Sequence, residues 1–212
     1  MNRTNRLPTI SLETIPVTRL MTRFAAPFAL LTVALLSGCA APPVQFYTLG
    51  APAIAQTSNT TLPATAPVLN VARVALPDYL DNQDIMTRHG DQLDRSPNGR
   101  WGSRLSQGVT DLLAARLGQD WPHYIVTTQP LAETPALRLA VNINRLDLDS
   151  SGQGALQADW ALVPSDTHRA ILRSRGSFTA QGSVATDAGK VALTRDLVEQ
   201  LASRIDSTIP HP

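Results

Sequence analysis

The chain contains little from which covalent or membrane-spanning structure could be built. Cys39 is the only cysteine among 212 residues, which excludes an intrachain disulfide and a thiolate metal cluster. The longest apolar run, residues 24–36, is shorter than the roughly 20 residues that a membrane-spanning helix needs. No charged residue lies between Cys39 and Ala72. A domain without disulfides must be held together by its hydrophobic core.

What precedes the cysteine predicts an export signal. Two arginines come before the apolar run 24–36, and the small residues Ser37-Gly38 follow it, an order typical of a secretory signal peptide over residues 1–38. The cysteine directly after this cleavage site resembles the bacterial lipobox, which implies that Cys39 is acylated. The alternative is a free or buried cysteine that follows a signal peptide. Translation from Met21 would also give a compact signal peptide, so Met21 is a possible true start.

Removal of the signal peptide changes the sign of the net charge. Four arginines and one glutamate leave, so that 14 basic and 16 acidic residues remain and the formal net charge becomes −2. The pI of about 8.0 belongs to the precursor and does not indicate nucleic-acid binding. No basic run interleaved with aromatic residues occurs, so nucleic acid is not an expected partner.

Residues 39–67 predict a short tether, one strand and a loop. The segment is rich in Pro, Ala and Thr, a composition that favours extended chain. Residues 44–49 are the exception, because they are β-branched and aromatic and lie between a proline and a glycine. We expect this first strand to join the sheet of a single domain spanning residues 68–209.

The first half of that domain predicts strands and one helix. Residues 68–76 predict a strand, and residues 85–88 and 92–95 predict the arms of a hairpin. Ser96-Pro97-Asn98-Gly99 is typical of a loop. Apolar residues then recur at helical spacing from Trp101 to Leu117 and predict an amphipathic helix of roughly 16 residues.

The second half predicts an antiparallel meander and a closing helix. Alternation predicts strands near 137–148, 156–162 and 172–179, and a phase slip at Asn144-Arg145 in the first of them predicts a β-bulge. Asp187 is a candidate cap for the last helix. The expected fold is α+β, a single domain in which two amphipathic helices pack on one face of an antiparallel sheet. The residues expected to be buried together are Leu112, Leu139, Val141, Leu156, Trp160 and Leu201.

Four segments carry a resemblance to a known family. In chain order they are Phe46-Tyr47-Thr48-Leu49, Val74-Ala75-Leu76-Pro77-Asp78-Tyr79-Leu80-Asp81, Ile85-Met86-Thr87-Arg88 and Arg100-Trp101. Together they resemble the PqiC/YmbA-like ABC-type transport auxiliary lipoproteins over essentially the whole mature chain. Asn82-Gln83-Asp84 departs from the Arg-Pro-Gln that the family usually has there.

The resemblance implies a function, a location and partners. It implies a non-catalytic accessory lipoprotein of an MCE-type intermembrane lipid transport system, with an MCE-domain tunnel protein and an inner-membrane component as partners. Ala40 stands where an aspartate would signal retention in the inner membrane, so by the same resemblance the protein is expected at the outer membrane, facing the periplasm. A homo-oligomer is possible.

Tyr79, Asp81 and Arg100 are the predicted partner-contact residues, because loop residues carry function more often than core residues do. Docking of the same loop on the core is the structural alternative. Asp78, Asp81 and Asp84 are spaced like calcium ligands, but no turn glycine and no terminal glutamate accompany them, so neither a metal nor a cofactor is expected.

Catalysis is not expected either. The sequence contains no His-Glu-x-x-His, no Gly-x-Ser-x-Gly and no glycine-rich phosphate loop. The alternative to a docking subunit is a stand-alone envelope lipoprotein that has a structural role or binds a small apolar ligand. A deep apolar pocket would favour the ligand binder.

Overall fold

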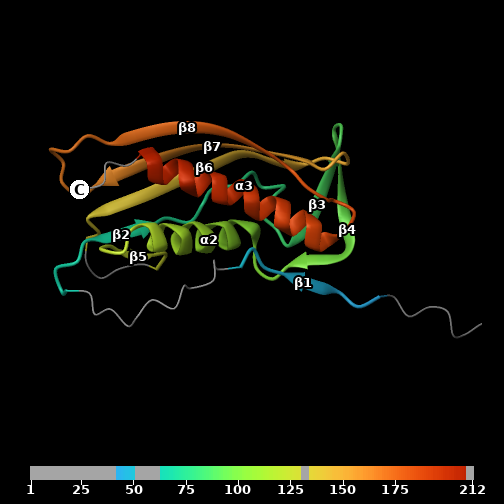
Figure 1. Ribbon diagram of the computed structural model, residues 1–212, viewed down its shortest axis with the longest axis horizontal. Helices are drawn as coiled ribbons and strands as arrows, with labels where there is room; N and C mark the ends of the chain where they lie inside the picture. The colour runs from blue at the N-terminus through green and yellow to red at the C-terminus, as the bar shows by residue number, and fades with distance from the viewer. Residues whose placement is uncertain (1–41, 51–62, 130–133, 209–212) are drawn as a thin grey trace, which may run out of the picture. The chain divides into compact units, whose positions relative to one another are not determined.

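Two β-sheets and two helices make up the described part of the chain, which comprises residues 42–50, 63–129 and 134–208 of a computed structural model. The larger sheet has the strand order β5-β2-β6-β7-β8, with β5 Ile125–Thr127, β2 Val68–Val71, β6 Leu137–Leu148, β7 Gln153–Pro164 and β8 Leu172–Gln181. The smaller sheet has the order β1-β4-β3, with β1 Gln45–Tyr47, β4 Gln92–Trp101 and β3 Asp84–His89. The helices are α2 Leu105–Asp120 and α3 Asp187–Thr208 (Figure 1).

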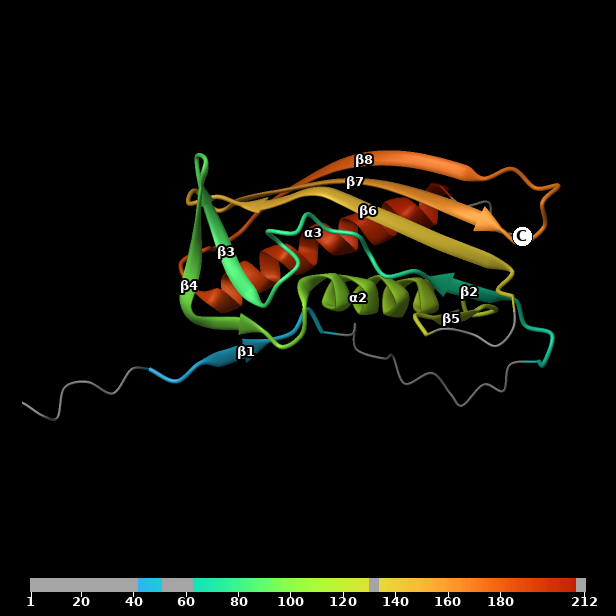
Figure 2. The same cartoon turned by 180° about the vertical axis from the view of Figure 1, so that it is seen from behind.

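Helices cover one face of the larger sheet. In both views α3 runs along β6, β7 and β8 on the same side as α2, which lies beside β2 and β5 (Figures 1 and 2). All six residues that were expected to be buried together lie in one core cluster. The described residues from Pro43 onward belong to one compact unit. The prediction of a single α+β domain with two helices on one face is therefore confirmed.

The larger sheet is mixed, so the prediction of a purely antiparallel sheet is wrong. Strands β6, β7 and β8 form the expected antiparallel meander. Strand β2, however, pairs in parallel with both β5 and β6. The chain reaches β5 from β2 through α2, and such a crossover connection is what parallel neighbours require. Alternation of apolar residues reports which face is buried but not the direction of the neighbouring strand.

The predicted β-bulge in β6 is confirmed. The pairing of β6 with β7 shifts between Ile143 and Arg145, within one residue of the phase slip in the sequence. Leu146 and Leu148 beyond the bulge remain buried. The bulge thus keeps both halves of a twelve-residue strand on the core.

Several element boundaries differ from the predictions. Strand β2 ends at Val71, although the chain still runs beside β6 as far as a bridge between Ala75 and Asn142. The hairpin arms are confirmed within β3 and β4, with Gly90 at φ +59° in the turn. The predicted loop 96–99 is instead part of β4, where these four residues bulge out opposite Ile85.

Trp101 ends β4 and does not open the helix, which begins at Leu105. The side chain of Trp101 is buried like the apolar residues of the helix, so its position in the sequence also matched the helical spacing of those residues. Asp187 is the first residue of α3, but the capping contact comes from Thr186, whose Oγ1 accepts a hydrogen bond from Gly189 N–H at 3.1 Å. The first predicted strand exists as β1, yet it pairs with β4 in the smaller sheet.

Candidate functional site

The loop formed by residues 77–84, which contains the family-like segment, is fastened to both neighbouring elements. Trp101 N–H at the end of β4 donates to Gln83 O at 2.7 Å. Leu105 N–H at the start of α2 donates to Asn82 O at 3.2 Å. The loop is thus held by the same short stretch of chain that links the smaller sheet to the helix.

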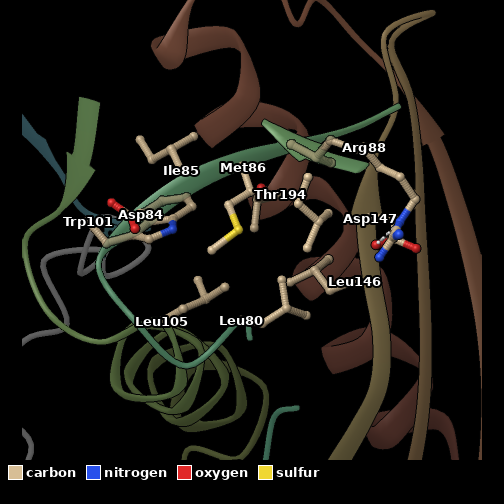
Figure 3. Close-up of a pocket in the computed structure, with 12 residues that line it drawn as sticks. Leu80, Asp84, Ile85, Met86, Arg88, Trp101, Leu105, Leu146, Asp147 and Thr194 are labelled. Atoms are coloured by element: carbon tan, nitrogen blue, oxygen red, sulfur yellow. Dashed lines mark ion pairs between the residues drawn. The ribbon is translucent and has the colours of Figure 1, made fainter. Parts of the chain in front are cut away.

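A small cavity lies beneath this loop (Figure 3). The side chains of Leu80, Met86 and Leu146 gather around it, and the buried Trp101 and Leu105 close it on the other side. Its volume of about 30 Å³ is enough for one or two water molecules but not for an acyl chain. Leu80, only 7 % exposed, therefore fixes the loop to the core.

Asp81 acts on the first turn of α2. Arg104, the residue before the helix, provides no side-chain cap, and Ser106 N–H donates to Asp81 Oδ1 at 3.2 Å instead. Arg104 Nη1 lies 3.9 Å from Asp81 Oδ2. Burial raises the pKa of Asp81, but the hydrogen bonds from Ser106 and the charges of Arg104 and Arg73 outweigh this effect, so the pKa is lowered overall. Asp81 is thus a capping carboxylate supplied from outside the helix.

Arg100 holds the bulge of β4 together. Its Nη1 donates to Ser96 O at 2.7 Å and to Gly99 O at 2.6 Å. Its Nε lies 3.2 Å from Asp84 Oδ1, which ties the bulge to β3. The side chain remains 21 % exposed. Most of the N–H groups of Arg100 that the structure shows in contact therefore bind partners within the domain.

Tyr79 is the most accessible of the three predicted contact residues, at 40 % exposure. Its side chain interacts with the Arg88 guanidinium, which is one of the smaller causes that raise the pKa of Arg88. In the described part of the chain, no hydrogen bond or ion pair joins any two of Tyr79, Asp81 and Arg100. The loop thus brings them into one neighbourhood, but each has its own partners.

Sequence reasoning missed an ion cluster around a buried aspartate at the edge of this cavity. Asp147 in β6 is only 7 % exposed and lies 2.8 Å from Arg88 Nε and 2.6 Å from Arg145 Nε. The Arg88 contact is at ion-pair distance, although its N–H is not aligned for a good hydrogen bond. The contact with Asp147, opposed by burial, raises the pKa of Arg88.

The signal for this cluster was present but ambiguous. Leu146, Asp147 and Leu148 are all buried, which means that this end of β6 is covered on both faces. The smaller sheet supplies the second cover, through a bridge between Arg88 and Asp149. A single alternating strand pattern does not reveal a second sheet.

The predicted lipid anchor, Cys39, lies outside the described part of the chain, whereas the loop with the three aspartates lies within it. Within the described residues, no group of three or more His, Cys, Asp or Glu side chains could hold a metal ion. The helices in the described ranges are too short or too polar to cross a bilayer.

Comparison with known proteins identifies the family. A family model described as ABC-type transport auxiliary lipoprotein component matches residues 47–206, which include the loop 77–84 and all helices and strands of the described residues except the first two residues of β1 and the last two of α3. The chain belongs to the ABC-type transport auxiliary lipoprotein family. The resemblance carried by the four sequence segments is therefore confirmed.

Relatives of this auxiliary lipoprotein support both the family and the fold. The intermembrane transport lipoprotein PqiC of Escherichia coli (strain K12) is 25 % identical over 128 residues, which cover 60 % of this chain and 68 % of PqiC. The crystal structure of an uncharacterized protein aligns with a TM-score of 0.65 at 20 % identity, covering 80 % of this chain and all of the other. A structure from Xanthomonas campestris aligns with a TM-score of 0.55 at 16 % identity, over 76 % and 92 % of the two chains. The two structures show the fold alone.

Proposed function

We propose that this auxiliary lipoprotein is a non-catalytic docking subunit of an MCE-type intermembrane lipid transport system. In this proposal acylated Cys39 holds it at the outer membrane, facing the periplasm. Its partners are the MCE-domain tunnel protein and the inner-membrane component of the same system. The name of PqiC, an intermembrane transport lipoprotein, supports transport between membranes.

The observation that carries the docking role is an exposed aromatic side chain on a rigid loop. Tyr79 is 40 % exposed, whereas its neighbour Leu80 is buried and Asp81 is bound to α2. A contact residue held on a fixed base loses little conformational freedom on binding, which favours affinity. Asp81 and Arg100, each partly exposed, complete the proposed contact surface and position it.

Phe46 is a fourth contact candidate, which sequence reasoning placed in a strand and in a family-like segment but not among the contact residues. It is 68 % exposed, and in β1 it pairs in register with Arg100 of β4. An exposed aromatic residue next to an arginine is the kind of pair that is enriched at protein interfaces. We therefore include Phe46 in the docking surface.

The alternative of a stand-alone binder of a small apolar ligand finds no support in the interior beneath the loop. The cavity there holds about 30 Å³, and the Arg88–Asp147 ion pair lies at its edge. An apolar ligand would require a deeper and less polar space.

The test is capture of the MCE-domain partner from the same organism by the full, lipidated chain extracted in a mild detergent. We expect the wild-type chain to bind, and Tyr79→Ala or Phe46→Ala to weaken binding at least about fivefold, as hot-spot aromatics do. Ile171→Ala is the matched control, because Ile171 is also 40 % exposed but lies before β8. No capture by the wild-type chain would remove the docking proposal. Equal losses in the control and the test variants would remove only the chosen surface.

A further inference from the structure

An open basin of about 720 Å³ lies on the face of the larger sheet opposite the helices. Its base is formed by β6, β7 and β8 together with the segment that continues β2 along β6. Figures 1 and 2 show α2 and α3 on the other side of these strands. No residue of the family-like loop 77–84 lines this basin, so it is distinct from the docking surface.

Short side chains form the floor of the basin and long ones form its walls. Ala140 of β6 pairs directly with Ala161 of β7, and these two methyl groups lie at the centre. Arg173 of β8 pairs with Ala161 from one side. Arg138 lies two residues along β6 from Ala140, on the same face because side chains alternate. Two arginines therefore border a small apolar floor, Arg173 across the sheet from Ala161 and Arg138 along β6 from Ala140.

The basin carries a net positive charge, although the mature chain is slightly acidic. Three arginines and one aspartate present charge there, namely Arg138, Arg173, Arg175 and Asp159, whereas Arg73 at the rim donates its Nε–H to Ser106 Oγ of α2 at 3.0 Å. Asp159 is already neutralised, because its Oδ1 accepts a hydrogen bond from Arg175 Nε at 2.5 Å and its Oδ2 accepts one from Asn144 Nδ2 at 2.6 Å.

Two of these arginines have side chains that are available to bind a ligand. Arg138 and Arg173 are exposed, and neither makes a hydrogen bond or ion pair with any group in the described ranges of the chain. Guanidinium groups bind phosphate oxygens in a bidentate manner and are the preferred partners of this anion in proteins. The charge of the basin thus favours an anionic ligand, and its volume of about 720 Å³ is large enough for one.

We propose that this basin binds the phosphate headgroup of an anionic phospholipid. In this arrangement Arg138 and Arg173 contact the phosphate, and the glycerol backbone lies on the alanine floor. The apolar floor and a volume within the range of small-ligand sites favour a lipid headgroup over a free phosphate ion. This site goes beyond the docking function and does not depend on it.

Native mass spectrometry of the full chain in a non-ionic detergent tests the proposal by counting bound lipid. The chain is titrated with phosphatidylglycerol and with phosphatidylcholine carrying the same acyl chains. We expect phosphatidylglycerol to bind at least about tenfold more tightly, as a pair of charge-assisted contacts allows. The double variant Arg138→Ala/Arg173→Ala should remove this preference.

Two further variants and one competitor distinguish a shaped lipid site from general electrostatic attraction. Ala161→Leu fills the floor without a change of charge and should also abolish the preference, which separates a shaped site from diffuse attraction. Arg116→Ala is the matched control, because it removes one partly exposed positive charge from α2, and it should leave binding within about twofold. Inorganic phosphate, added as a competitor, should displace the lipid only at far higher concentrations.

Each contrary outcome overturns the proposal. Equal binding of the two lipids, or an equal loss in Arg116→Ala, would show that the basin does not select an anionic headgroup. Displacement by inorganic phosphate at matching concentrations would assign the basin to free phosphate. Because lipid counting and partner capture are separate measurements, failure of either proposal leaves the other standing.

Discussion

Single residues around the loop 77–84 stabilise distant parts of the domain, and these contacts could not be predicted from their positions in the sequence. Asp81 caps a helix that begins more than twenty residues later, and Arg100 satisfies two carbonyl groups of a bulge. Gly99 in this bulge lies against Asp187 of α3, whose Oδ2 also accepts a hydrogen bond from Ser96 Oγ at 2.7 Å. These contacts bring distant segments together with almost no free space.

At this scale the first prediction concerns Asp81. Asp81→Ala should lower the free energy of unfolding by about 1 kcal/mol at neutral pH, because Ser106 N–H loses its acceptor. Asp81→Asn keeps an acceptor oxygen and should cost less. Urea denaturation of the two variants and the wild type measures both values. Equal costs for Ala and Asn would show that charge, not capping, is what matters.

The same residue predicts a pH dependence. Because the pKa of Asp81 is lowered in the folded chain, its contribution to stability is complete above the unfolded pKa of about 3.9. The contribution is lost as the pH falls through the lower, folded value. Denaturation curves should therefore show a steeper acid loss of stability in the wild type than in Asp81→Asn. Parallel acid profiles would contradict the assignment.

A second prediction compares two glycines, one with no room for a side chain and one with space around it. A Cβ at Gly99 would lie 2.5 Å from Asp187 Cγ, so Gly99→Ala should destabilise the domain by about 1–3 kcal/mol. Gly118 lies inside α2, where the nearest atom to a new Cβ would be 3.8 Å away. Gly118→Ala should therefore stabilise the domain by about 0.5–1 kcal/mol. Thermal unfolding of both variants checks the two signs, and the same sign for both would be inconsistent with this packing.

At the scale of elements, helix α2 and strand β6 connect the two sheets. Helix α2 buries Leu112, Leu113 and Leu117 on one side, and Trp121 at its end donates its indole N–H to Asp206 of α3 at 2.7 Å. Strand β6 packs on α3 and on β3, and a bridge between Arg88 and Asp149 follows directly after its end. Loss of either element would expose surface of both sheets.

The third prediction tests the packing of α2. Leu112 is 1 % exposed, and Leu112→Ala should lower the free energy of unfolding by about 2–5 kcal/mol through lost burial and an unfilled cavity. Asp111→Ala is the matched control on the exposed side of the same turn and should change stability by less than about 0.5 kcal/mol. Chemical denaturation measures both. An unchanged midpoint for Leu112→Ala would mean that α2 is misplaced.

At the scale of the whole molecule, the auxiliary lipoprotein has two distinct surfaces. One contains Phe46 and Tyr79 around the smaller sheet and the loop 77–84. The other is the arginine-rimmed basin on the open face of the larger sheet. We propose that acylated Cys39 holds both surfaces at the membrane.

The fourth prediction concerns this anchor. Each buried methylene contributes about 0.8 kcal/mol and one chain alone binds only marginally, so stable attachment depends on several acyl chains at one site. In cell fractionation, Cys39→Ser should appear in the periplasm or accumulate as precursor. Tyr79→Ala, which leaves the signal intact, should remain in the outer membrane with the wild type. Recovery of Cys39→Ser in the outer-membrane fraction would refute the assignment.

The sequence by itself determined what depends on local pattern. Both helices, the β6–β7–β8 meander, the bulge near Asn144 and the buried set around Leu139 follow from the period and phase of apolar residues, which a short window contains. The four family-like segments likewise stand in the sequence as short motifs.

Only the tertiary structure decided what depends on distant partners. The parallel pairing of β2, the separate sheet of β1, β4 and β3, and the burial of Asp147 each join segments many residues apart. The basin also arises this way, since Arg138 and Arg173 are 35 positions apart and come to line one basin only through the pairing of β6, β7 and β8. Apolar periodicity records whether a side chain is buried, but not which element buries it, because that choice is settled by the packing of the whole chain.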